Sequence, residues 1–142
     1  MFDGLDHGVR VLFIAPVDLL VWADRIRPHL SKMADGSGGR YETQDLFADI
    51  ASGHSLLWVA LEGPELRCVM IGQIMEYPRL RALRLTGIVG NNPLRWRGLL
   101  GLIEDQAKRQ FNCTMMESVH QPRHGVLLRG YTSTHWLSEK SL

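Results

Sequence analysis

Apolar residues along the chain form short runs and periodic stretches, and these predict alternating strands and helices. Residues 9–15 are mostly apolar and are followed by Pro16, which predicts a buried strand that ends there. Across residues 17–34 apolar side chains recur every three or four positions, which indicates a helix with one buried face. Pro28 lies inside this pattern, so we expect it to kink the helix or to split it in two.

The next stretch predicts a loop and a second, shorter helix. Residues 35–39 read Asp-Gly-Ser-Gly-Gly, and we expect a flexible loop between two helices there. Thr43 is a candidate cap for the short helix, whose buried side includes Leu46, and Gly53 is a natural stop.

Three strand patterns follow within residues 56–89. They cover residues 56–61, 66–77 and 80–89, and the connections between them are short. Short connections favour antiparallel pairing, so this part predicts a three-stranded meander.

The last part predicts one long helix and then further short elements. Asn92 is a good helix cap and Pro93 lies at the favoured first position. We expect a strand at residues 113–119, a short helix at 122–129 and a last strand at 131–137. The order β-α-α-β-β-β-α-β-α-β predicts one α/β (α+β) domain over residues 1–142, with a mixed, mostly antiparallel sheet and helices on both faces.

Composition narrows the functional classes. The chain is 45% hydrophobic and 22% charged, and its net charge of +1 argues against a non-specific nucleic-acid binder. Cys68 and Cys113 lie in apolar stretches and are predicted to be buried free thiols. No membrane span or signal peptide is expected, which favours a cytoplasmic protein or one associated with a particle.

Several weak motifs together carry a family resemblance. They are Leu57-Trp58-Val59-Ala60 with Glu62-Gly63, Tyr77-Pro78-Arg79-Leu80-Arg81-Ala82-Leu83, Gly90 followed by Trp96 and Leu99-Leu100-Gly101-Leu102-Ile103-Glu104, Ala107 with Cys113, and Leu127-Leu128 with Gly130-Tyr131. In these residues the chain resembles the GNAT (N-acetyltransferase-like) superfamily over about residues 17–142. It resembles most closely the small GNAT-like proteins of phages and prophages.

The resemblance implies acetyl-CoA as the cofactor, with its pyrophosphate held on backbone N–H groups at the start of the central helix. The matching positions here are Ile88, Val89, Gly90, Asn91, Asn92, Leu94 and Arg95. The sequence departs from the family pattern, because Leu94 and Trp96 stand at glycine positions and Pro93 removes a donor. Two hypotheses stay open: this loop binds CoA, or it has lost the ability to bind CoA.

Two carboxylates are candidates for the base that the resemblance implies. Glu76 ends a central strand and Glu117 lies on the strand after the long helix. The alternatives are that Glu76 is merely solvated and that Glu117 pairs with an arginine. Residues 126–129 contain no tyrosine to serve as the family's acid, and Tyr131 is interpreted as a packed aromatic.

Other chemistry-bearing residues favour simpler interpretations. His120 and His124 are four apart, but Pro122 and Gly125 interrupt a helix there, so no metal site is predicted. Arginines 79, 81 and 84 are interpreted as a solvated sheet edge. The alternatives are that they hold the CoA phosphates or dock an acidic partner.

Two functional hypotheses follow. The first is an acyl-CoA-dependent N-acyltransferase that transfers an acetyl group to an unknown amine. The second is a non-catalytic interaction module of GNAT fold, such as a phage virion or accessory component, acting through a protein partner, a homo-oligomer or a phage particle. The corresponding locations are the cytoplasm, that of a bacterial host if a phage encodes the protein, or the virion.

Overall fold

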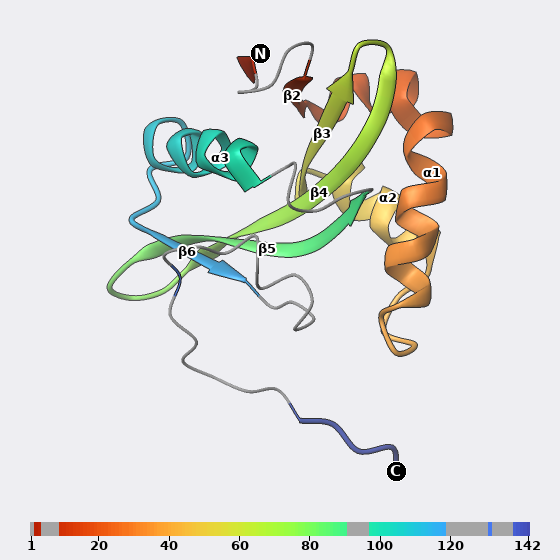
Figure 1. Cartoon of the computed structure of the whole chain (residues 1–142). Helices are drawn as coiled ribbons and strands as arrows, with labels where there is room; N and C mark the ends of the chain where they lie inside the picture. The colour runs from red at the N-terminus through yellow and green to blue at the C-terminus, as the bar shows by residue number, and fades with distance from the viewer. Residues whose placement is uncertain (1, 4–8, 91–96, 119–130, 132–137) are drawn as a thin grey trace.

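The computed structural model describes residues 2–3, 9–90, 97–118, 131 and 138–142. Its elements are β1 (Phe2–Asp3), β2 (Val9–Ile14), the short 3-10 helix η1 (Pro16–Asp18), α1 (Leu19–Asp35), α2 (Thr43–Ala51), β3 (Leu56–Glu62), β4 (Glu65–Glu76), β5 (Arg81–Gly90), α3 (Arg97–Arg109) and β6 (Met115–Ser118) (Figure 1).

The strands form one sheet in the order β1-β2-β3-β4-β5-β6. Neighbouring strands are antiparallel except β5 and β6, which are parallel. The α3 helix provides the crossover that a parallel pair needs. The predicted mixed and mostly antiparallel sheet is therefore confirmed, and among the described strands the sequence pattern missed the two-residue β1.

Helices cover both faces of the sheet, as predicted (Figure 1). On one face α1 and α2 pack against alternate residues of the central strands; this core contains Ile26, Leu30, Met33, Leu46, Ile50, Leu57, Val59, Val69 and Ile71. On the other face α3 packs against the intervening residues; this core contains Trp58, Ala60, Cys68, Met70, Leu83, Leu85, Leu100, Ile103 and Ala107. The period of two along each strand explains why both faces are apolar.

Two expectations about the helices differ from the structure. The α1 helix continues through Pro28, so the expectation that Pro28 splits this helix in two is wrong. Ile26 and Leu30, on either side of Pro28, are buried, and their packing offsets the one backbone hydrogen bond that proline cannot donate. Thr43 is the first residue of α2 and Glu42 is its cap. The carboxylate of Asp45 accepts a hydrogen bond of 2.8 Å from the Glu42 N–H, which is one half of a capping box at the start of the helix.

The loop between α1 and α2 has a defined internal anchor. Ser37 is buried, and its Oγ accepts hydrogen bonds from the N–H groups of Arg40 and Tyr41 at 3.2 and 3.3 Å. Gly38 and Gly39 adopt positive φ angles of 69° and 80°, which glycine tolerates without strain. The glycines expected to make this loop flexible therefore allow a specific turn.

Some predictions fall outside the described residues. These are the helix cap at Asn92 and Pro93, the helix at 122–129, and all of the last strand except Tyr131. In the part of the chain that the structure describes, no helix is both long and apolar enough to cross a membrane.

Candidate functional site

The pairing of β5 with β6 is described from Ala82 opposite Met115 to Leu85 opposite Ser118. Ser118 is the last described residue before 119–130, whereas β5 itself continues to Gly90.

A β-bulge lies in β5 directly after Leu85. Ile71 of β4 is opposite Gly87, but Gly72 is opposite Leu85, so Thr86 is left without a partner residue in β4. The Thr86 hydroxyl donates a hydrogen bond of 3.3 Å to the carbonyl oxygen of Ile71, which holds the bulge. Bulges bend a strand and redirect its side chains and backbone, and they are common beside functional sites.

Three polar side chains meet at Arg84, two residues before the bulged Thr86. Arg84 of β5 lies opposite Glu117 of β6, and its Nε and Nη2 donate to Glu117 Oε2 at 2.9 and 2.8 Å. The hydroxyl of Tyr77, which directly follows β4, donates to the same oxygen at 3.0 Å. Arg84 Nη2 also donates to the Tyr77 hydroxyl at 3.1 Å, so the three groups form a closed triangle.

This triangle lies on the sheet face that α1 and α2 occupy. Strand alternation places Arg84 opposite the face of Leu83 and Leu85, which pack toward α3. Beyond the two helices this face is open to solvent, since Tyr77 is 39% and Met115 is 47% exposed. The Glu117 side chain is 22% exposed, so a solvent-borne ligand can reach it.

The geometry also sets the ionisation of the triangle. The hydrogen bond to Glu117 raises the pKa of Tyr77, so this phenol is neutral at physiological pH. The same carboxylate raises the pKa of Arg84, which therefore stays charged. One arginine cation and one carboxylate thus face each other, and a neutral phenol binds both.

Glu76 lies in a different environment from Glu117. Its side chain is 71% exposed and forms an ion pair with Arg81, whose Nε also donates to the carbonyl oxygen of Phe111 at 2.7 Å. Glu76 pairs with Arg81, which is three residues before Arg84, so Glu76 lies about 10 Å along β5 from the Arg84–Glu117 pair.

The described cofactor candidates are Ile88, Val89 and Gly90 at the end of β5. Ile88 and Val89 are half-buried and pack toward opposite faces of the sheet. A Cβ at Gly90 would lie 2.8 Å from the carbonyl oxygen of Arg67 and 2.9 Å from Cys68 Cβ. Close approach of β4 therefore accounts for glycine at this position. Asn91, Asn92, Leu94 and Arg95 lie outside the described residues.

The remaining candidates have structural environments. Tyr131 packs against the α3-side core and its hydroxyl donates to Glu104 at 2.7 Å; burial is the main cause of its raised pKa. Cys68 and Cys113 are buried free thiols, as predicted. Among the described residues no cluster of metal-binding side chains occurs; His120 and His124 lie outside them.

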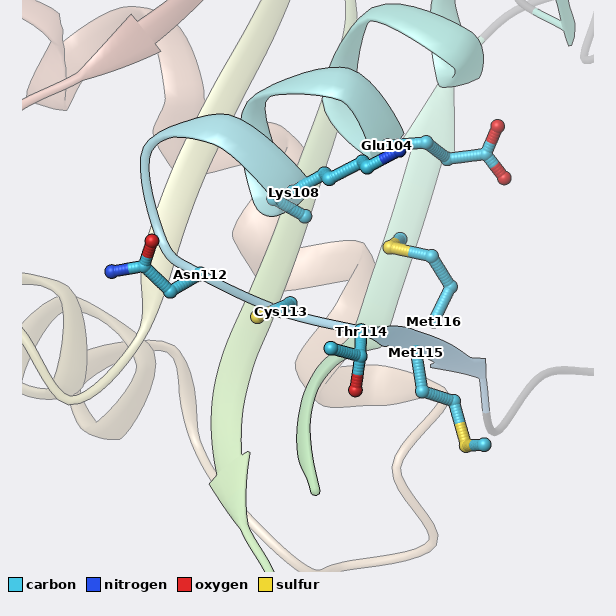
Figure 2. Close-up of a pocket in the computed structure, with 8 residues that line it drawn as sticks. Glu104, Lys108, Asn112, Cys113, Thr114, Met115 and Met116 are labelled. Atoms are coloured by element: carbon cyan, nitrogen blue, oxygen red, sulfur yellow. The ribbon is translucent and has the colours of Figure 1, made fainter.

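A hollow of about 580 Å³ lies beside the end of α3 and the start of β6 (Figure 2). Its lining includes Glu104, Lys108, Cys113 and Met116. Met116 packs toward the α3-side core, and none of Tyr77, Arg84 and Glu117 lines this hollow. It is therefore separate from the triangle.

The prediction that Glu117 pairs with an arginine is confirmed by its ion pair with Arg84, but the sequence did not identify which arginine, nor connect Glu117 with Tyr77. Tyr77 and Arg84 lie within residues 77–84, which contain three arginines, and which of these side chains meets Glu117 depends on the register of the strands. Arg81 and Arg84 form ion pairs with Glu76 and Glu117, so the interpretation of this run as simply solvated is incomplete. A charged residue between the apolar Leu83 and Leu85 was the available sign that Arg84 faces away from the α3-side core.

Neither a family model nor a curated protein matches this chain. Solved structures do match it over nearly its whole length. A probable acetyltransferase has a TM-score of 0.70 at 16% identity, covering 94% of this chain and 96% of the other. Ribosomal-protein-alanine N-acetyltransferase from Brucella melitensis biovar Abortus 2308 has a TM-score of 0.68 at 17% identity, covering 94% of this chain and 98% of the other.

A third structure is a predicted acetyltransferase with acetyl-CoA from Clostridium acetobutylicum. Its TM-score is 0.61 at 13% identity, and 93% of this chain and 96% of the other are covered. Identities this low establish the fold alone. The chain therefore has the fold of GNAT acetyltransferases, as its sequence pattern suggested.

Proposed function

We propose that this protein is an acetyl-CoA-dependent N-acetyltransferase that acts on an amine and uses Glu117 at its reaction centre. The observation that carries the proposal is the Glu117 carboxylate, which is 22% exposed and held by Arg84 and Tyr77 close to the bulge of β5. The likeness of fold to acetyltransferases supports the reaction class.

The last part of β5 is where we place acetyl-CoA. The pantetheine part of CoA is an extended chain with amide groups, which can lie along a strand, and β5 bends at its bulge at Thr86. Ile88 and Val89 lie on this segment, and Gly90 would serve through its backbone. When bound, acetyl-CoA supplies the acetyl group as an activated thioester.

Glu117 supplies the charge that an amine substrate requires. Its carboxylate attracts an ammonium group and accepts a proton from the nitrogen as that nitrogen becomes a nucleophile. In the net reaction the amine gains the acetyl group and loses a proton, the thioester C–S bond breaks, and CoA leaves as the thiol with that proton. We do not extend this role to Glu76, because it is 71% exposed, forms an ion pair with Arg81 and lies about 10 Å along β5 from the Arg84–Glu117 pair.

The test combines binding with turnover. Calorimetry measures acetyl-CoA affinity, and release of CoA thiol is followed with a panel of amines: a peptide with a free N-terminus, lysine, a polyamine and an aminoglycoside. We expect Glu117→Gln to lower kcat about a hundredfold or more while acetyl-CoA affinity is kept. Glu76→Gln is the matched control and should retain activity. No binding of acetyl-CoA at millimolar concentration would contradict the proposal.

A second candidate function is a non-catalytic interaction module, as in a virion component. Its supporting observation is an apolar patch of Val17, Leu20 and Val21, which are 85%, 89% and 78% exposed and lie three and four residues apart. Sedimentation of the wild type and of the Leu20→Ser/Val21→Ser variant tests this candidate. Assembly that the variant loses, without acetyl-CoA binding, would favour the module; a monomeric wild type that binds acetyl-CoA would reject it.

A further inference from the structure

The Glu117 carboxylate is held asymmetrically. Arg84 Nε, Arg84 Nη2 and the Tyr77 hydroxyl all donate to Oε2, at 2.9, 2.8 and 3.0 Å. Among the described residues no donor binds Oε1. Within this part of the chain, one oxygen of the carboxylate accepts three hydrogen bonds and the other accepts none.

We propose that Arg84 and Tyr77 are positioning residues that fix the Glu117 carboxylate and leave Oε1 as the oxygen that meets the amine. This inference rests on the proposed function. Neither residue needs to touch the substrate. Each acts through Glu117, by restricting its side-chain torsions and by occupying Oε2.

The three residues come from three separate segments, which makes the arrangement specific. Glu117 is on β6, Arg84 is opposite it on β5, and Tyr77 follows β4. Tyr77 is itself placed by a turn, since its N–H donates to the carbonyl oxygen of Leu80 at 2.9 Å. A side chain bonded to two others from neighbouring strands has few alternative rotamers, so Glu117 is oriented before a substrate arrives.

Arg84 and Tyr77 hold the Glu117 carboxylate through short, charge-assisted hydrogen bonds. The charged or titratable side chains that contact Glu117 within the described residues are Arg84 from β5 and Tyr77 from the segment after β4. The next pair, Glu76 and Arg81, lies three residues earlier along β5 and is bonded internally. Removal of Arg84 or Tyr77 should therefore let the Glu117 side chain leave its position.

The first experiment observes the Glu117 carboxyl group directly and needs no substrate. Protein labelled with ¹³C at the glutamate carboxyl groups is studied by NMR, and Glu117→Gln identifies the Glu117 resonance. We expect Arg84→Gln to move this resonance, Tyr77→Phe to move it by less, and Arg84→Lys, which keeps one donor, to move it by less than Arg84→Gln. The control is Arg79→Gln, a change to a nearby exposed arginine for which the structure gives no contact with Glu117.

The second experiment measures turnover with the best amine of the panel. We expect Tyr77→Phe and Arg84→Gln each to lower kcat about tenfold with KM for acetyl-CoA unchanged, and Arg84→Lys to recover part of the loss. Thermal unfolding confirms that each variant is folded. If the wild type acetylates an amine but Tyr77→Phe and Arg84→Gln keep its kcat, the positioning role is overturned and the proposed function stands. If the wild type neither binds acetyl-CoA nor acetylates any amine, both fail, whatever the NMR spectra show.

Discussion

The indole Nε1–H of Trp58 on β3 donates a hydrogen bond of 2.8 Å to Oε1 of Gln106 on α3, and both side chains are buried. Gln106 Nε2 in turn donates to Gln110 Oε1 at 2.9 Å, one helical turn further on. This polar link fixes α3 against the sheet within an otherwise apolar core. It thereby fixes the crossover that makes β5 and β6 parallel.

Breaking this link should destabilise the protein from either side. Gln106→Leu leaves the Trp58 N–H buried without an acceptor, and Trp58→Phe leaves the glutamine oxygen without a donor. Each change should lower the free energy of unfolding by about 1–3 kcal/mol, the cost of an unsatisfied buried group. Urea unfolding of both single variants and the double variant is the measurement. Because both changes remove the same bond, the double variant should lose less than the sum; strict additivity would contradict the role of the bond.

Gly90 and Gly101 should respond in opposite directions to alanine. A Cβ at Gly90 would lie 2.8 Å from the Arg67 carbonyl oxygen, so Gly90→Ala should cost about 1–3 kcal/mol through overpacking. Gly101 is exposed on α3 with no atom within 4 Å of its added Cβ, so Gly101→Ala should stabilise by about 0.5–1 kcal/mol. Urea unfolding of each variant tests both predictions: the midpoint should shift while the dependence of the unfolding free energy on urea concentration stays the same. An unchanged midpoint for Gly90→Ala would show that β4 does not constrain this position.

The two thiols should be inert in the native protein. Burial raises the pKa of Cys68 to about 12, and burial is also the main cause of the raised pKa of Cys113. At pH 8 only about one Cys68 thiol in ten thousand is then the reactive thiolate. Mass spectrometry after iodoacetamide treatment should show modification of Cys68 only when urea unfolds the chain. Equal rates in native and unfolded protein would contradict its burial.

Periodicity was sufficient to predict the meander, the two-sided helix cover and the parallel crossover, because buried faces repeat every two or 3.6 residues. It could not place Glu117 against Arg84 and Tyr77, since that contact depends on the register of β5 with β6. The resemblance placed Gly90 in a ligand cradle, which stays a prediction, but no sequence pattern could show the close approach of the Arg67 backbone to Gly90, because it is a tertiary feature. Pro28 remained inside α1 because burial of Ile26 and Leu30 outweighed local propensity.

Binding of acetyl-CoA along the last part of β5 is the central claim, and glycine amide resonances test it most directly. Protein labelled with ¹⁵N-glycine is titrated with acetyl-CoA. The amides of Gly87 and Gly90 report on this part of β5, while Gly39 and Gly53, in loops outside β5, are internal controls. The account predicts saturable shifts at Gly87 and Gly90 with little change at Gly39 and Gly53. Unchanged Gly87 and Gly90 resonances at millimolar acetyl-CoA would contradict it.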